Sequence, residues 1–388
     1  MQLQLPARWA LCEAMFRFLH SSDLHLGKRF GNFPDDLRGR LREARHGAIG
    51  RLAAQALANG ANTILLAGDT FDTETPTPAI LRQALAEMGR HASLTWIMLP
   101  GNHDSLLADQ LWDAARAAAP ANVVLAVTTA PIDLAPDITV LPAPCTARRP
   151  GRDLTDWMSS AATPEGTLRI GLAHGAIQQF SEDTAASDVI APNRATLAGL
   201  DYLALGDWHG QIAVNERTWY SGTPEPDRFK HDRPGSALLV TLDGAGAPPQ
   251  VSAVETASFT WRDLSLELLS GEDGVMALET LLPIAVDRRQ TLLRVMANGR
   301  TRLPARTALL AALDQIAPDF AHLEVNADGL ATDADAADLD RIDRSGALRD
   351  AANALLLESQ DAARSEAERE IANAALVRLF TYCEAIAP

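Results

Sequence analysis

The stretch TILLAGDTFD, residues 63–72, joins a short apolar run to a glycine and two aspartates. A run of this length and composition that stops at a glycine is typical of a buried strand feeding a loop. Four other stretches have the same form: FRFLH (16–20), LTWIML (94–99), LRIGLA (168–173) and DYLAL (201–205). Each run ends at Gly, Pro, Ser, His or Asp, so we predict five buried strands that are followed by polar loops.

Helical stretches separate the first of these strands. They are rich in Ala, Leu and Arg and lie at about 36–58, 79–90 and 108–118. Alternation of strands and helices predicts an α/β layered domain. Ligands in such folds gather at the carboxyl ends of the strands, so we expect the polar residues after the five runs to share one rim.

The second half of the chain predicts a smaller unit and a helical tail. Residues 219–243 are typical of β structure, and GAGAPP (244–249) is the clearest candidate linker. Beyond it, SFTWRDLSLELL (258–269) and QTLLRVMANG (290–299) predict strands around a helix near 273–285. From about residue 336 the chain is Ala-rich and helical, with a stripe of apolar residues at helical spacing: Ile371, Ala375, Leu379 and Tyr382.

These patterns predict four segments. They are an N-terminal extension at 1–14, with Met15 an alternative start, a main domain at 15–248, a small α+β domain at 249–335, and a helical tail at 336–388. A chain of 388 residues with 47% hydrophobic content is long enough and apolar enough for a large buried core.

Charge and cysteine content limit the classes of protein. The formal net charge is −16, and residues 241–388 hold 13 arginines and 24 acidic residues, so most of the acidic excess is C-terminal. Bulk charge therefore neither supports nor excludes a polyanionic substrate, because a local patch or bound cations can attract one. Three widely spaced cysteines argue against a disulfide framework. No apolar stretch approaches a membrane span, and we expect a cytoplasmic protein.

The loops after the predicted strands carry metal-ligand side chains in a regular series. These are Asp23 and His25, then Asp69 and Asp72, then Asn102, His103 and Asp104, then His174, and finally Asp207 and His209. Oxygen and imidazole donors without thiolate suit Mn, Mg, Fe or Zn. The donors exceed what one ion needs, and two ions about 3.5–4 Å apart would use them to hold the attacking and leaving oxygens of a phosphoester.

Each loop on its own has a plainer interpretation. Gly-Asp alone is usually a turn, and a single His174 is more often a hydrogen-bonded core histidine. The ordered series, with each member after a predicted strand, outweighs these interpretations. His20, which lies inside the first strand, we interpret as structural.

The ordered series D-x-H, G-D, G-N-H-D, H and G-x-x-H resembles that of the calcineurin-like metallophosphoesterases. HSSDLHLGKRF, LLAGDTFDTETPTP, MLPGNHDS and the later YSGTPEPDRF are similar to the SbcD-type branch of DNA repair exonucleases. The resemblance covers about residues 16–243. It implies a four-layer metallophosphoesterase β-sandwich flanked by helices, followed by a small α+β capping domain and a C-terminal helical tail.

The resemblance also implies roles for individual residues. Asp23, His25 and His209 would hold one divalent ion, Asn102, His174 and the residue at 207 a second, and Asp69 would bridge them, with manganese favoured over Mg, Fe or Zn. A water between the ions would be the nucleophile. His103 would stabilise the transition state or protonate the leaving oxygen, with Asp104 fixing its tautomer.

One loop departs from the family pattern. The family usually has Gly-His-x-His where this chain has Gly-Asp-Trp-His, so Asp207 stands in place of a ligating histidine. A carboxylate still binds metals, and we expect metal binding to persist with a preference shifted toward Mn or Mg. Trp208 is most simply a packing residue, with base stacking as the alternative. Arg29, Arg228, Lys230 and Arg233 are candidate phosphate contacts or solvated side chains.

The leading hypothesis is a two-metal DNA exo/endonuclease that works with an SMC-like coiled-coil ATPase bound through the C-terminal region. The resemblance also suggests a homodimer. Two alternatives stay open: a phosphatase or phosphodiesterase acting on a small nucleotide substrate, and a weakly catalytic subunit that regulates an ATPase.

Overall fold

A computed structural model describes residues 15–177, 189–230 and 233–386. These residues form two compact units that divide between Thr260 and Trp261. The predicted N-terminal extension, residues 1–14, lies outside the described residues. Both units mix helices and strands, so the predicted α/β class is confirmed. None of the described helices is long and apolar enough to cross a membrane.

Two six-stranded sheets build the first unit. The first sheet has the order β12-β11-β1-β2-β3-β4, and β1 to β4 run parallel to one another. Its strands are β1 (Phe16–Ser21), β2 (Thr63–Leu66), β3 (Thr95–Met98), β4 (Val123–Leu125), β11 (Ser236–Leu242) and β12 (Gln250–Glu255).

The second sheet has the order β5-β6-β7-β8-β10-β9, and its central strands β6, β7, β8 and β10 are parallel. Its strands are β5 (Ile132–Ala135), β6 (Ile138–Ala143), β7 (Leu168–His174), β8 (Tyr202–Gly206), β9 (Ile212–Asn215) and β10 (Thr218–Tyr220).

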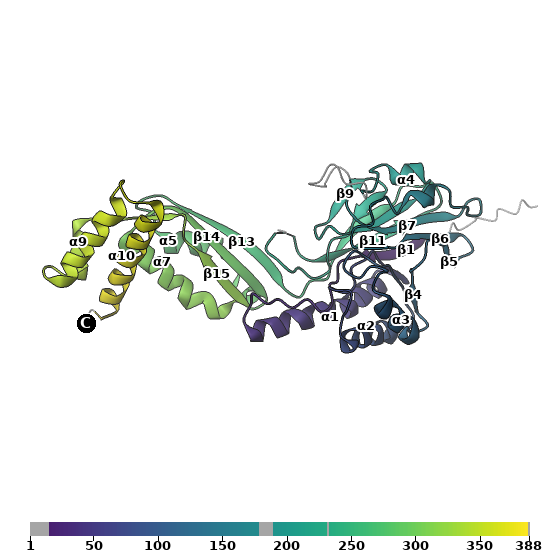
Figure 1. Cartoon of the computed structure of the whole chain (residues 1–388), viewed down its shortest axis with the longest axis horizontal. Coiled ribbons are helices and arrows are strands. Elements are labelled where there is room, and N and C mark those ends of the chain that lie inside the picture. The colour runs from purple at the N-terminus through teal and green to yellow at the C-terminus, as the bar shows by residue number, and fades with distance from the viewer. Residues whose placement is uncertain (1–14, 178–188, 231–232, 387–388) are drawn as a thin grey trace, which may run out of the picture. The chain divides into compact units, whose positions relative to one another are not determined.

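Alternation along the buried strands produces four layers. In β2, Leu65 faces the core between the two sheets, whereas Ile64 and Leu66 face the helices α1 (Asp35–Ala58), α2 (Pro78–Arg90) and α3 (Asp109–Ala118). In β8, Tyr202 and Ala204 face the same central core, and Leu203 and Leu205 face the outer cluster that includes residues of η1 (Asp156–Ser159) and α4 (Arg194–Leu197). Figure 1 shows α1, α2 and α3 together on one side of the sheet that contains β1 and β11. The implied four-layer sandwich is therefore present.

Local signals explain the helices of this unit. Thr77 caps the N-terminus of α2, because its side chain accepts a hydrogen bond from the amide of Ile80. A proline follows in the first turn of the helix. Helix α1 carries Asp35 and Asp36 in its first turn, which favours the positive end of the helix dipole. Its buried face includes Leu37, Leu41 and, unusually, Arg45.

The boundary of the first unit differs from the predicted one at 248/249. GAGAPP joins β11 to β12, which pair antiparallel from Ser236↔Glu255 to Thr241↔Gln250. Gly and Pro mark chain reversals as well as linkers, and here they mark a hairpin. The first unit consequently extends through β12 to Thr260.

The second unit combines the predicted capping segment with the helical tail. Its sheet contains β13 (Thr260–Leu268), β14 (Thr291–Arg302), β15 (His322–Asn326) and β16 (Leu330–Asp333). Its helices are α5 (Gly274–Leu281), α6 (Ala285–Arg288), α7 (Leu303–Ile316), η2 (Ala317–Asp319), α8 (Ala336–Ile342), α9 (Ala347–Gln360) and α10 (Glu366–Ile386). Leu303 of α7 shares a core with the last three helices, so the tail is not a separate body.

The buried face of α10 also differs from the predicted stripe. Ala372, Leu376 and Phe380 are buried in the core of the second unit. Ile371 and Tyr382 are 69% and 60% exposed. The face that packs is rotated by about one residue from the predicted one, because several alanines on this helix fit either side.

His20 links the two sheets of the first unit. It is fully buried on β1, and its Nδ1 lies 3.0 Å from the Tyr202 hydroxyl while its Nε2 lies 3.1 Å from the Leu205 carbonyl oxygen, both on β8. A carbonyl only accepts, so Nε2 carries the proton and Nδ1 accepts from the hydroxyl. Burial lowers the pKa of His20 to about 3. This agrees with the structural role predicted for it.

His20 should make the fold acid-sensitive. An unfolded histidine takes up a proton near pH 6.5, whereas folded His20 does not do so until about pH 3, so stability is complete above pH 6.5 and falls as the pH decreases. Between pH 7 and pH 5 this residue should lower the free energy of unfolding by about 2 kcal/mol. Urea unfolding at pH 7 and pH 5 measures how much the free energy of unfolding decreases between the two. This decrease should be smaller by that amount in His20→Gln than in the wild-type protein. Equal losses in the two proteins would contradict the assignment.

Candidate metal centre

The predicted ligands lie at the carboxyl ends of five parallel strands. Asp23 and His25 follow β1, Asp69 follows β2, and Asn102 follows β3; His174 ends β7, and Asp207 and His209 follow β8. The first three strands are neighbours in one sheet and the last two are neighbours in the other. The structure therefore brings all seven residues to one edge of the sandwich, as the sequence predicted.

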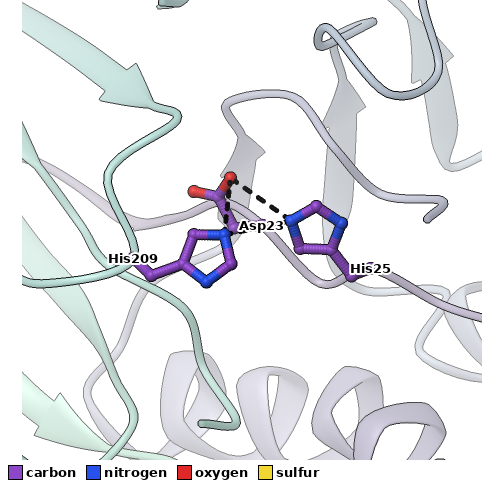
Figure 2. Close-up of side chains that lie close together, drawn as sticks. All are labelled: Asp23, His25 and His209. Carbon is purple, nitrogen blue, oxygen red and sulfur yellow. Dashed lines mark hydrogen bonds and ion pairs between the residues drawn. The ribbon is translucent and has the colours of Figure 1, made fainter. Parts of the chain in front are cut away.

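One set of ligand atoms is formed by Asp23, His25 and His209. Nε2 of His25 lies 3.8 Å from Asp23 Oδ1, and Nε2 of His209 lies 3.9 Å from the same oxygen. The two Nε2 atoms are 3.1 Å apart. Figure 2 shows the carboxylate of Asp23 and the two rings directed toward one another.

A second set surrounds His174. Its Nε2 lies 3.5 Å from Asp69 Oδ2 and 3.8 Å from Asp207 Oδ1. The Asn102 amide donates to Asp207 Oδ1 at 3.0 Å. Asp69 Oδ2 is also 3.7 Å from Nε2 of His25, so Asp69 stands between the two sets.

Hydrogen bonds at Nδ1 orient two of the three predicted ligand histidines. Nδ1 of His174 donates to the Ala67 carbonyl at 2.8 Å, and Nδ1 of His209 donates to Asp227 Oδ1 at 3.3 Å. Nδ1 of His25 lies 3.3 Å from Asp72 Oδ1 but makes no hydrogen bond among the described residues. An oxygen acceptor at Nδ1 fixes the tautomer and leaves the Nε2 lone pair for a metal. His174 and His209 are therefore held in the tautomer that metal binding requires.

The site fits divalent cations on its own chemistry. Asp23 Oδ1 and Asn102 Oδ1 are buried oxygens without a hydrogen-bond partner among the described residues. Such atoms are rare in folded proteins, where buried oxygens are almost always hydrogen-bonded. Nε2 of His25 and Nε2 of His209 lie 3.1 Å apart, close enough for both to bind one ion. Among the described residues, three groups each bring their ligand atoms within 4.8 Å of one another. They are Asp23/His25/His209, His25/Asp69/His103 and Asp23/Asp69/His174.

Electrostatics within the pocket point the same way. Burial acts to raise the pKa of Asp69, yet the neighbouring His174 and His25 hold it below its usual value. Burial likewise acts to lower the pKa of His174, but the Asp69 carboxylate raises it well above the usual value. Both pKa shifts show that negative charge in this pocket favours a positive charge beside it.

Backbone strain is concentrated in these loops. Among the described residues, five non-glycine residues have positive φ, and four of them are predicted ligands: Asp23 at 55°, His25 at 43°, Asp69 at 53° and Asp207 at 104°. Strained backbone of this kind clusters at functional sites, where the surrounding structure enforces it. At Gly101, an added Cβ would lie 2.1 Å from Asp69 Oδ1, so a side chain there would displace that ligand.

His103 reaches the same pocket, but Asp104 does not orient it. Its backbone amide donates to Asp69 Oδ1 at 2.8 Å, and its Nδ1 donates to the Asp72 carbonyl at 2.9 Å. The Asp104 carboxylate instead accepts the amides of Gly101 and Phe71 and is fully buried. Adjacent residues in this loop point in different directions, so the predicted role of Asp104 is corrected: it shapes the loop, and the Asp72 carbonyl fixes the His103 tautomer.

Two supporting carboxylates were not assigned roles from the sequence. Asp72 contacts His25 through its side chain and His103 through its carbonyl. Asp227 contacts His209. The signal for Asp227 was its place in YSGTPEPDRF, where two prolines stiffen the chain just after the last ligand loop.

The residues predicted to contact the substrate differ in their contacts and in their exposure to solvent. Arg228 pairs with Asp227 at 2.9 Å. Lys230 Nζ lies 5.6 Å from the ring centre of Trp208. Trp208 is partly buried against the outer cluster of the second sheet, which supports the packing interpretation. Arg29 is exposed on the loop that follows His25.

One family model and several solved structures are similar to this chain. Similar solved structures include the TT1561 protein of Thermus thermophilus (12% identity over 62% of this chain and 99% of that one, TM-score 0.38). They also include the purple acid phosphatase PPD1 from yellow lupin seeds (13% identity over 63% of this chain and 52% of that one, TM-score 0.42). A dimetal phosphatase from Danio rerio is similar as well (10% identity over 61% of this chain and 98% of that one, TM-score 0.33). These scores are too low to carry an argument. No curated protein matches the chain. The model of the calcineurin-like phosphoesterase family matches residues 16–235, which include every predicted metal ligand, and the chain belongs to that family.

Proposed function

We propose that this chain is a two-metal phosphodiesterase that acts on DNA, of the SbcD type, and that it works with an SMC-like coiled-coil ATPase. The observation that carries the proposal is the double set of ligand atoms around Asp69, with buried Asp23 and Asn102 oxygens that have no hydrogen-bond partner in the described part of the chain. Two sets joined by one carboxylate are what a two-ion phosphoester site requires.

The ligand sets divide as the family resemblance implies. Asp23, His25 and His209 hold one ion, Asn102, His174 and Asp207 hold the other, and Asp69 bridges them. When bound, the two ions supply positive charge to the attacking and leaving oxygens of the phosphoester. Three carboxylates and an amide oxygen among seven donors favour a hard cation such as Mn²⁺ or Mg²⁺.

His103 is the proton donor in this proposal. Its ring nitrogen lies within 4.8 Å of ligand atoms of His25 and Asp69, so it borders the centre where the phosphoester would bind. The Asp72 carbonyl at 2.9 Å occupies Nδ1. Nε2 is thus the ring atom left to protonate the leaving oxygen.

A rim of cations supports a polyanionic substrate. Lys28 and Arg29 follow the first ligand loop, and Arg228, Lys230 and Arg233 follow the segment that contacts His209. Arg29, Arg228, Lys230 and Arg233 are exposed. Exposed cations beside a phosphoester site contribute to binding the phosphate backbone of nucleic acids.

A groove in the second unit supports the proposed ATPase partner. A groove of about 780 Å³ lies between α7 and α10, and its apolar lining includes Leu310, Ile371 and Tyr382. Large exposed apolar side chains around a groove commonly mark a protein-binding surface. We propose that a coiled-coil helix of the partner packs there.

Substrate choice tests the main proposal. With Mn²⁺ the protein should cleave linear DNA and a model phosphodiester faster than p-nitrophenyl phosphate, and EDTA should abolish both cleavages. A preference for the monoester would instead support a small-substrate phosphatase. Two bound ions without hydrolysis of any substrate would support a regulatory subunit.

His103→Gln tests the proton donor. It should lower kcat for DNA cleavage by about 10²–10⁴-fold, because general acid catalysis has that magnitude. Isothermal titration should still show two Mn²⁺ ions, since His103 is not a ligand in this proposal. Full activity in the variant would remove His103 from the reaction.

Asp207→Ala tests the substituted ligand. Loss of this carboxylate should reduce the bound Mn²⁺ from two ions to one, as measured by metal analysis after dialysis. Asp207→His, which restores the usual residue of the family, should keep two ions and serves as the control. If Asp207→Ala still binds both ions, Asp207 only orients the Asn102 amide.

A further inference from the structure

Asp227 occupies an unusual position beside the proposed metal centre. Its side chain is 1% exposed, and its carboxylate contacts four positively charged or ionisable groups. Lys28 Nζ lies 2.5 Å from Oδ2, Arg228 Nε 2.9 Å from Oδ1, His209 Nδ1 3.3 Å from Oδ1, and Arg45 Nη2 3.5 Å from Oδ2. The His209 contact is the one that faces the metal centre.

We propose that Asp227 is a positioning residue that fixes His209 for metal binding, and that Lys28, Arg45 and Arg228 hold Asp227 in turn. This inference rests on the proposed function and adds to it a second layer of residues outside the ligand loops. Asp227 touches neither the substrate nor the ions in this assignment.

The connection runs through one imidazole ring. His209 Nε2 lies 3.9 Å from Asp23 Oδ1, on the side of the metal centre, and its Nδ1 faces Asp227 on the opposite side. A carboxylate accepts a proton from Nδ1, which fixes the tautomer and ring orientation and raises the basicity of Nε2. His209 lies on a loop, so its ring depends on such a contact for its orientation.

Arg45 couples this carboxylate to the first ligand loop. The guanidinium is 1% exposed within α1, and Nη1 donates to the Leu24 carbonyl at 2.9 Å. Leu24 lies between the ligands Asp23 and His25. Arg45 Nη2 reaches Asp227. A buried arginine is costly unless carboxylates compensate it. Asp227 is one of the carboxylates that do so for Arg45, and Arg45 thereby connects the two loops that carry the ligands proposed for the first ion.

Loss of Asp227 would change the charge around the proposed metal centre as well as the orientation of His209. Lys28, Arg45 and Arg228 surround Asp227, and removal of this carboxylate would add one net positive charge close to the proposed ion. A loss of metal binding in an Asp227 variant has therefore two candidate causes, the lost orientation of His209 and the added positive charge. The test must separate these causes.

Asp227→Asn is the first variant, because it keeps the shape of the side chain. Titration of metal-stripped protein with Mn²⁺ should show one of two equivalents bound about 10–100-fold more weakly, and the other unchanged. Nitrogen-15 spectra of the histidine rings should show that His209 no longer adopts a single Nδ1-protonated tautomer, a change that a merely structural role would not produce.

A double variant, Asp227→Asn with Lys28→Met, restores the charge balance and relieves the unpaired cation. It should show the same weakened Mn²⁺ equivalent. Recovery of wild-type affinity in the double variant would overturn the inference, because the single variant would then have acted through charge alone. This pair also keeps the test informative if Asp227→Asn alone unfolds.

Asp201→Asn is the matched control. Asp201 is also a buried, arginine-paired aspartate of the first unit, since it accepts the amides of Arg169 and Gly246 and lies 3.6 Å from Arg217. It lies at the start of β8, at the opposite end of that strand from Asp207. Both Mn²⁺ equivalents should be unchanged. Equal weakening in this control, or wild-type binding in Asp227→Asn, would refute the positioning role. If the wild-type protein binds no Mn²⁺, the proposed function itself fails.

Discussion

Crowding of buried carboxylates and imidazoles is the constraint on which this site depends. The Nε2 atoms of His25 and His209 lie 3.1 Å apart, and the carboxylates of Asp23 and Asp69 lie beside them with little access to water. Burying charge without compensation is costly, so this arrangement favours positive charge at its centre. Cations between the two ligand sets would supply that charge. The affinity for metal is thus a property of how the chain crowds these atoms together.

The two sheets make this crowding geometrically possible. Parallel neighbours β1, β2 and β3 present their loops at one edge, and β7 and β8 bring the loops of the second sheet to the same place. The loops then turn sharply, with four ligand residues at positive φ. Each such residue costs on the order of 1–3 kcal/mol. The extensive core between the sheets offsets this strain, and this explains why a small constellation of ligands is carried by a large domain.

Five buried strands could be predicted from sequence, because burial leaves a strong pattern. The five apolar runs are strands within one or two residues of their predicted limits. Short or half-exposed strands such as β5 and β12 were missed, since alternate exposure weakens the apolar signal. The fully buried β6 was missed as well, because a threonine and a proline interrupt its apolar run. The ligand positions followed from their places after the strands. Side-chain direction inside a loop did not, and for that reason Asp104 received a role that belongs to the Asp72 carbonyl.

The acidity of the chain does not oppose a nucleic-acid substrate, because electrostatic attraction is local at physiological salt. Solvent-exposed charges more than about 8 Å apart are largely screened by dissolved salt, so remote acidic residues contribute little at the proposed metal centre. Around Asp227, the cations Lys28, Arg45 and Arg228 lie on the His209 side of the site. In the proposed assignment, the cluster that orients His209 also places basic side chains where a phosphate would approach. One buried aspartate thus packs basic side chains beside the proposed metal centre.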